Sequence, residues 1–118
     1  MMSVYVKTNS FRATPYKSLI NYKEIKEKAL AHSHLLLKTW LPNGVIKAHE
    51  YIALNPTRHD QHLGSFRINM RSGQWADFAT SDRGGDLIAL LAYLDHSTQS
   101  QATHKISSLL GLEAHHVR

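Results

Sequence analysis

The segment from Leu54 to Leu94 most constrains the fold, because two short segments of strand character lead directly into a continuous apolar run. In SFRINM, residues 65–70, apolar and polar side chains alternate, which is typical of a strand with one buried face. RSG then predicts a tight turn, and QWADFAT, residues 74–80, is expected to return as the hairpin partner. LIALLAYL, residues 87–94, is apolar nearly all round and predicts a buried helix. The segment therefore predicts a small β-ribbon packed on a helix.

Ribbons of this size are often held together by a metal, yet the chain contains no cysteine. Neither a disulfide nor a thiolate metal site is therefore available. The hydrophobic fraction of 42 % is that of an ordinary globular protein. We expect the ribbon to be stabilised by packing of Phe66, Ile68, Trp75 and Phe78 against the apolar helices.

Histidine is the remaining candidate metal ligand, and the chain has nine. His59 and His62, with Asp60 between them, form the only cluster close to the ribbon. A structural zinc site needs four ligands in a tetrahedral arrangement, and this loop does not supply them. We expect neither a metal nor another cofactor, and we expect the loop histidines to be solvated.

Helical patterns flank the ribbon on both sides. Asn21 is suited to cap a helix whose apolar positions recur at helical spacing up to Trp40, and LPNG, residues 41–44, ends it. VIKAHEYIAL, residues 45–54, reads as one strand, followed by the polar loop NPTRHDQHLG. SDRGG, residues 81–85, reads as a second loop, and Asp86 is suited to cap the apolar helix. A last helix is expected from Thr98 to Leu110, with Gly111 ending it.

The resulting fold class is α+β, a three-stranded antiparallel sheet packed with about three helices. A length of 118 residues fits one domain, which we place at residues 21–112. A basic N-terminal arm is expected over residues 1–20, where the composition allows flexibility, and a frayed tail over residues 113–118. No apolar run approaches the roughly 20 residues of a membrane span, and no secretory signal is visible. We therefore expect a cytoplasmic protein without a membrane partner.

The charge balance is basic, with 14 Lys and Arg against 9 Asp and Glu. Four of the arginines, Arg58, Arg67, Arg71 and Arg83, fall within the ribbon and its loops. The planar guanidinium suits phosphate groups well, and a basic surface fits a nucleic-acid partner. A mildly positive surface without a polyanionic partner explains the charge equally well.

The order of motifs in the ribbon resembles the zinc-binding ribbon of bacterial and phage DNA primases. Those domains run Cys-Pro-x-His, Pro-Ser-Phe, Cys-Phe-x-Cys and then Gly-Gly-Asp before an apolar helix. Here NPTR, GSF, DFAT and GGDLIALLAYL stand in the same order, over residues 45–95. The chain looks closer still to the cysteine-free form of this ribbon in primase- or helicase-like proteins of phages and plasmids.

The departure from the family lies at the four positions that would bind zinc, which are Asn55, Arg58, Asp77 and Thr80 here. Only Asp77 is a usual zinc ligand, so the resemblance implies a ribbon that has lost its metal. An ion pair between Arg58 and Asp77 would join the two former ligand arms. Such a pair adds little net stability but leaves a costly orphan charge when one partner is removed.

The resemblance implies a non-catalytic nucleic-acid-binding module in replication or mobile-element maintenance, with single-stranded DNA as the favoured partner. Arginines would contact phosphates and an aromatic side chain would stack on bases. The candidate binding residues are Arg58, Arg67, Asn69, Arg71, Trp75 and Arg83. For each arginine alone, exposure on a solvated sheet face is the simpler explanation. Arg58 has the ion pair with Asp77 as a further structural explanation, and Trp75 is also a candidate for the core.

Two other functions stay open at this point. The ribbon could be a protein-interaction module that docks on a primase, a helicase or another replication or mobile-element protein. An enzyme is the less favoured reading. Asp77, Asp82 and Asp86 could be imagined as a two-metal cluster, but helix capping explains Asp86 and no nucleophile–base pair is visible. We therefore expect no catalytic residues.

Overall fold

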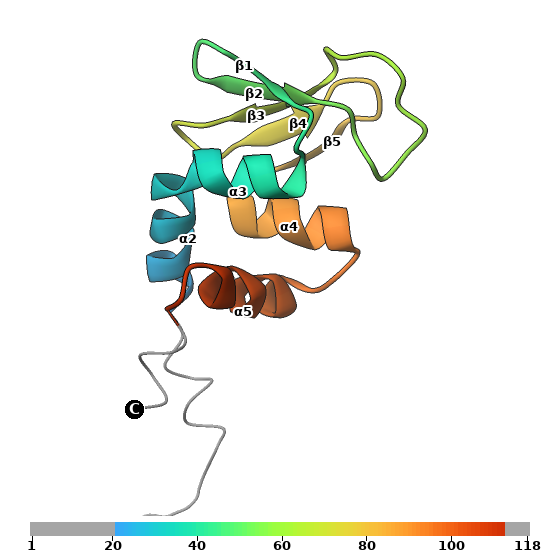
Figure 1. The fold of residues 1–118 in the computed structure, drawn as a ribbon. Coiled ribbons are helices and arrows are strands. Elements are labelled where there is room, and N and C mark those ends of the chain that lie inside the picture. The colour runs from blue at the N-terminus through green and yellow to red at the C-terminus, as the bar shows by residue number, and fades with distance from the viewer. Residues whose placement is uncertain (1–20, 113–118) are drawn as a thin grey trace, which may run out of the picture.

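The computed structural model describes residues 21–112 of the chain. The expected N-terminal arm at residues 1–20 and the expected tail at residues 113–118 lie outside the described residues. Within them, the elements are α2 (Tyr22–Ala31), α3 (Ser33–Trp40), β1 (Val45–Lys47), β2 (Glu50–Ala53), β3 (Phe66–Asn69), β4 (Trp75–Asp77), β5 (Asp82–Gly84), α4 (Leu87–Asp95) and α5 (Gln99–Leu109). The five strands form one antiparallel meander in sequence order, shown in Figure 1.

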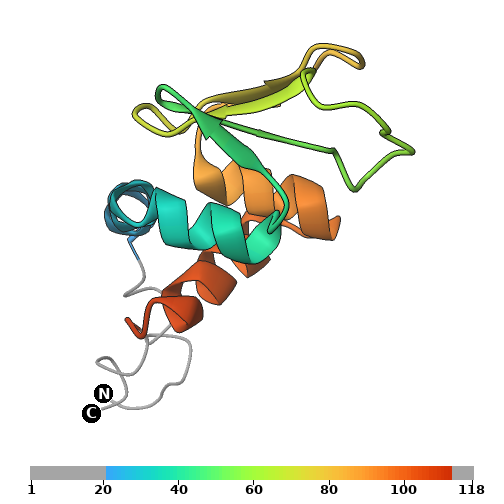
Figure 2. The same ribbon diagram turned by 45° about the horizontal axis from the view of Figure 1, so that its top comes forward.

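The sheet and the helices form separate layers (Figures 1 and 2). The sheet lies on one side, α3 and α4 pack beneath it, and α5 lies on the far side of α4. All helices of the described chain therefore lie on one face of the sheet, and the opposite face is left without a helix. The expected α+β class is confirmed, but the described residues contain five strands and four helices instead of three strands and about three helices.

Both extra strands arise from segments that were interpreted differently in the sequence. The expected single strand at 45–54 is a hairpin, because a two-residue turn at Ala48 and His49 folds β1 back on β2 with Lys47 opposite Glu50. Ala48 has a positive φ of 56°, which an alanine rarely adopts. The expected loop at 81–85 contains β5, which pairs with β4 through Ala76 and Arg83.

The expected single helix up to Trp40 is divided at His32. Asn21 caps α2 as expected, because its side chain accepts from the N–H groups of Lys23 and Glu24. At His32 the backbone leaves helical geometry, and α3 then runs in a new direction beneath the sheet (Figure 2). The change of direction allows α2 to bury Ile25 against other helices while α3 buries Leu37.

The two C-terminal helices begin where they were expected, and each begins with a side-chain cap, which was predicted for Asp86 only. The Asp86 carboxylate accepts from the Ala89 N–H, and α4 follows directly. Thr98 and Gln101 form a reciprocal capping box at the start of α5. At the other end of α5, Gly111 adopts a positive φ of 75°, which ends the helix as expected.

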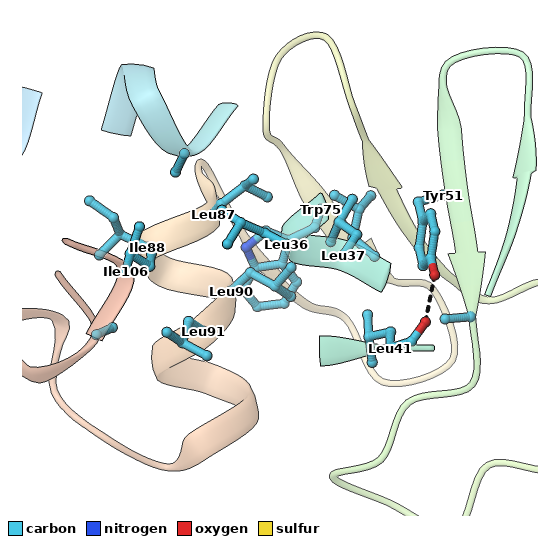
Figure 3. Packing of buried hydrophobic residues seen from close by; sticks show 14 of the residues in the cluster. Leu36, Leu37, Leu41, Tyr51, Trp75, Leu87, Ile88, Leu90, Leu91 and Ile106 are labelled. Carbon is cyan, nitrogen blue, oxygen red and sulfur yellow. Dashed lines mark hydrogen bonds between the residues drawn. The ribbon is translucent and has the colours of Figure 1, made fainter. Parts of the chain in front are cut away.

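The core lies between the inner face of the sheet and the helices (Figure 3). Phe66 and Ile68 are fully buried there, as expected, and Trp75 is 5 % exposed. The Trp75 indole lies against Gly84 of the neighbouring strand, where a Cβ would come within 2.5 Å of the ring. Phe78 was also expected in the core, but this prediction is wrong because its side chain is 73 % exposed. Phe78 stands three positions after Trp75, so the alternation of the strand directs it to the face opposite Trp75, away from the helices.

Candidate nucleic-acid interface

The strand register assigns the candidate residues to two faces of the sheet. Residues directly opposite each other in an antiparallel pair point to the same face. One row joins Ile52, Arg67, Ala76 and Arg83 across four strands, and its members lie on the outer face, away from the helices. The next row on that face joins Lys47, Glu50 and Asn69. The alternation expected for SFRINM is therefore confirmed, and it places Arg67 and Asn69 on the surface without a helix.

Arg67 lies at the middle of the outer face and is partly engaged there. Its Nη1 donates to Glu50 Oε1 at 2.8 Å, and its Nε donates to the Gly64 carbonyl at 2.7 Å. The side chain is still 38 % exposed. Arg67 is thus held in one orientation across β2 and β3, with part of its guanidinium free for another acceptor.

Arg83 and Arg71 are more accessible. Arg83 is exposed on the edge strand β5, one strand beyond Ala76 in the row that contains Arg67. Because neighbouring strands lie about 4.8 Å apart, the two arginines are roughly 10 Å apart across the sheet. Arg71 is exposed at the tip of the β3–β4 hairpin. Within residues 21–112 neither guanidinium forms an ion pair or hydrogen bond, so both are available to an anionic ligand.

Asn69 has a structural role in the same hairpin. Its Oδ1 accepts from the N–H groups of Arg71 and Ser72, at 2.9 and 3.1 Å. This Asx turn shapes the tip of the hairpin, and Gly73 completes it with a φ of 85°. The carbonyl end of the Asn69 amide is therefore used locally, while its amino group faces the outer surface.

Trp75 was expected to be the stacking platform, and the structure corrects this. The ring belongs to the inner face, where it packs at 4.8 Å between centroids against Tyr93 and edge-to-face against Phe66. Its Nε1 donates to the Asp86 carbonyl at 3.1 Å. The indole therefore has no free face for a base. The exposed aromatic of the ribbon is Phe78, which was expected in the core although its separation of three positions from Trp75 places it on the opposite face of the strand.

A shallow groove of about 470 Å³ brings most of these residues together. It runs over β2, β3, β4 and β5, and its lining includes Glu50, Arg67, Asn69, Phe78 and Arg83. Ala76, a small residue, lies between the two arginine strands and leaves the groove open above it. Of the expected binding residues, Arg58 and Arg71 do not line this groove.

Arg58 belongs to a separate buried cluster centred on Asp77. Arg58 Nε donates to Asp77 Oδ2 at 2.7 Å, and its Nη2 contacts the other oxygen at 3.3 Å and the Ser65 hydroxyl at 2.9 Å. Asp60 lies 3.3 Å from the same guanidinium. The expected ion pair is therefore present, and together with the bond to Ser65 it engages the Nε and Nη2 donors of Arg58. The expectation that Arg58 binds nucleic acid stays a prediction, and the contacts of Arg58 here are those of a structural ion pair.

The four positions equated with zinc ligands all meet at Asp77. Asn55, which is 1 % exposed, donates from Nδ2 to Asp77 Oδ2 at 2.9 Å and to the Tyr93 hydroxyl at 2.8 Å. The Thr80 N–H donates to the Asp77 carbonyl at 3.2 Å. Together with Arg58, these contacts join the two loops by hydrogen bonds and one ion pair.

The electrostatics of this cluster favour the ionised carboxylate. Burial alone would raise the pKa of Asp77, but the hydrogen bonds from Arg58, Asn55 and the Ala79 N–H outweigh it and hold the pKa well below its ordinary value. The same contact with Asp77 raises the pKa of Arg58. Both groups are therefore charged across the physiological range, as a structural ion pair requires.

Metal-ligating side chains do not gather elsewhere in the described chain. No group of three or more His, Asp or Glu residues within residues 21–112 is placed to hold a metal ion. Asp82, which could be imagined in a two-metal cluster, accepts a hydrogen bond from the Tyr93 hydroxyl at 2.7 Å. Asp86 is used as the cap of α4.

A second cleft of about 410 Å³ opens at the end of the molecule where α3 leads into β1. Its lining is mostly apolar and includes Trp40, Leu54 and Leu63, with Arg58 and His59 at its polar side. Leu54 and Leu63 are 41 % and 50 % exposed.

No helix within residues 21–112 is long and apolar enough to cross a membrane.

Comparisons with known proteins add no relative. No protein-family model, no curated protein and no solved structure matches this chain. The site is therefore interpreted from its own geometry.

Proposed function

We propose that this protein is a non-catalytic module that binds single-stranded nucleic acid, with DNA as the favoured ligand, on the outer face of its sheet. The observation that carries the proposal is the groove in which Arg67 and Arg83 flank Ala76 with Phe78 exposed beside them. Guanidinium groups bind phosphates, and an exposed aromatic ring stacks on bases.

The preference for a single strand follows from the aromatic contact. A base in a duplex is stacked on its neighbours, so Phe78 can reach a base face only where the strand is unpaired. Arg71 at the hairpin tip extends the positive surface along β3. A strand crossing the sheet would meet Arg83, the groove and then Arg71, which suits a backbone that carries one charge per nucleotide.

The resemblance to primase ribbons supports the same function. The positions equated with metal ligands lie side by side around Asp77, and a hydrogen-bonded cluster would replace the zinc there. We propose on this basis a role in replication or mobile-element maintenance, without a metal or other cofactor.

The test is a fluorescence-anisotropy titration of labelled single-stranded and duplex oligonucleotides at low and high salt. The proposal expects binding of the single strand at low salt, weaker binding of the duplex, and a steep loss of affinity as salt rises, because bound phosphates release counterions. Absence of any complex at low salt would contradict the proposal.

Docking on a primase or helicase partner is the second candidate function. It is favoured by the apolar cleft beside Leu54 and Leu63, which expose side chains that a protein partner would cover. An apolar interface depends far less on salt than phosphate binding does. Binding to such a partner that persists at high salt would identify the cleft as the functional surface.

A further inference from the structure

Glu50 places a carboxylate inside the groove whose other charged side chains are Arg67 and Arg83. A carboxylate repels phosphate, so a surface that binds only the backbone would be weakened by it. The Glu50 side chain is 34 % exposed, and its Oε1 is fixed at 2.8 Å from Arg67 Nη1. Within residues 21–112 no donor is directed at its second oxygen. Glu50 therefore presents a positioned acceptor to whatever occupies the groove.

The ion pair also presents a donor beside this acceptor. Arg67 carries five N–H donors and uses only two of them in the bonds to Glu50 and Gly64. The second oxygen of Glu50 and the remaining lone pair of its Oε1 can accept from two neighbouring N–H groups, so a ligand edge that satisfies the pair fully has an acceptor adjacent to two donors. Phosphate has acceptors only, so it satisfies Arg67 and not Glu50.

Among the bases, this pattern fits the Watson–Crick edge of guanine. Guanine presents the O6 acceptor beside the N1–H and N2 amino donors, so Arg67 can donate to O6 while the Glu50 carboxylate accepts from both N–H groups. Adenine and cytosine offer one amino group beside an acceptor, and thymine offers a single imide N–H between two carbonyl groups. The edges of unpaired bases are read in this way in single-stranded nucleic acids.

We propose that the groove selects guanine, with the Glu50–Arg67 pair reading its Watson–Crick edge and the base lying over Ala76. Phe78, at the other end of the groove, stacks on a neighbouring base, and Arg83 contacts the phosphate. The inference rests on the proposed function and adds a sequence preference to it.

The experiment measures the anisotropy of labelled oligodeoxythymidylate strands that carry one central guanine, inosine, adenine or cytosine. For the wild-type protein we expect guanine to bind at least about tenfold more tightly than thymidine alone, as a good bidentate contact to a base allows. Inosine, which lacks the N2 amino group, is expected to fall between guanine and the other bases.

Three variants separate base reading from fold stability. Glu50→Ala removes both the hydrogen-bond acceptor and the repulsion between the carboxylate and the phosphates. We therefore expect the guanine preference to vanish while affinity for plain oligodeoxythymidylate is retained or rises. Glu50→Gln keeps the size and the bond to Arg67 but loses one acceptor, and it should also lose the preference. Glu27→Ala removes an exposed acid of α2 with the same charge change and should behave as wild type.

The outcomes distinguish this inference from the function on which it rests. Equal, salt-dependent binding of all strands overturns the guanine preference and leaves the binding function intact. A guanine preference that survives in Glu50→Ala and Glu50→Gln overturns the role of Glu50. Absence of binding to every strand at low salt overturns both proposals.

Discussion

Arg58, in the loop between β2 and β3, forms a 2.7 Å ion pair with Asp77 at the end of β4, 19 positions later in the sequence. Asp77 is fully buried, whereas the Arg58 side chain is 27 % exposed. The contribution of the pair to stability therefore depends mainly on what happens to the buried carboxylate when its partner is removed.

Replacing Arg58 by alanine should strongly destabilise the fold. The Asp77 carboxylate would stay buried without its cation, and removing one partner of such a pair is destabilising because the remaining charge is uncompensated. The measurement is urea denaturation followed by circular dichroism. The double variant Arg58→Leu/Asp77→Leu should lose less free energy of unfolding than the sum of the losses in Arg58→Leu and Asp77→Leu. The reason is that neither side chain is left as an unpaired charge in the double variant. Full additivity would show that the two residues do not interact.

The Asp77 cluster should also make the fold sensitive to acid. Because the folded-state pKa of Asp77 is depressed, its contribution is present above the unfolded pKa, which is about 4, and is lost as the pH falls further below that value. We expect the free energy of unfolding, measured by denaturant titration at several pH values, to fall below about pH 4.

The variant Asp77→Asn identifies the source of this acid sensitivity. It should be less stable than wild type at neutral pH and should show a flatter dependence on pH. Asp95→Asn, which removes an exposed carboxylate paired with Lys105, is the matched control and should keep the wild-type dependence. If the free energy of unfolding of Asp77→Asn depended on pH as steeply as that of the wild type, the acid sensitivity would come from other groups.

Gly84→Ala should destabilise the sheet by about 1–3 kcal/mol, because its Cβ would lie 2.5 Å from the Trp75 ring and the indole is fixed by the core. Gly85→Ala is the matched control, since a Cβ there meets nothing within 4 Å. Thermal or chemical denaturation compares the two. Equal stability of both variants would contradict the packing of Trp75 against β5.

Arg83→Ala and Phe78→Ala should weaken single-stranded DNA binding in different ways. Loss of Arg83 should reduce the slope of log affinity against log salt by about 1, because one phosphate contact is removed. Loss of Phe78 should cost about 1–3 kcal/mol of binding free energy, and the slope of log affinity against log salt should stay unchanged.

Both side chains are exposed, so the stability of both variants should be nearly that of the wild type. Lys26→Ala on α2 is the control for charge, and equal effects of Lys26→Ala and Arg83→Ala would contradict a specific site.

Periodicity and capping residues were sufficient to predict several elements. The alternation around Ile68 correctly predicted the β3–β4 hairpin and its buried face, the cap at Asp86 correctly predicted the start of α4, and helical spacing correctly predicted α5. Each of these signals is local, since a cap or an alternating strand depends on residues within a few positions. The ion pair of Arg58 with Asp77 was also predicted, from the resemblance to the primase ribbon, in which both positions would bind the metal.

The division of Val45–Leu54 into two strands was missed because its turn uses Ala48 instead of glycine or asparagine. β5 was missed because DRG has no strand propensity of its own and forms only beside β4. Phe78 was wrongly expected in the core together with Trp75, because a separation of three positions places the two side chains on opposite faces of a strand. Trp75 had been named both as a core residue and as a stacking candidate, and it lies on the face that the helices cover.

The sequence by itself determined the α+β class, the hairpin, the positions of most helix ends and the absence of any thiolate metal site. These follow from side-chain chemistry and from contacts between near neighbours in the chain. Only the tertiary structure decided that Trp75 is buried, that Phe78 is exposed, that Arg58 is engaged by Asp77, and that Glu50 lies with Arg67 and Arg83 in one groove. Such relationships depend on strand register and on which face the helices cover, and those are set by the packing of the whole chain.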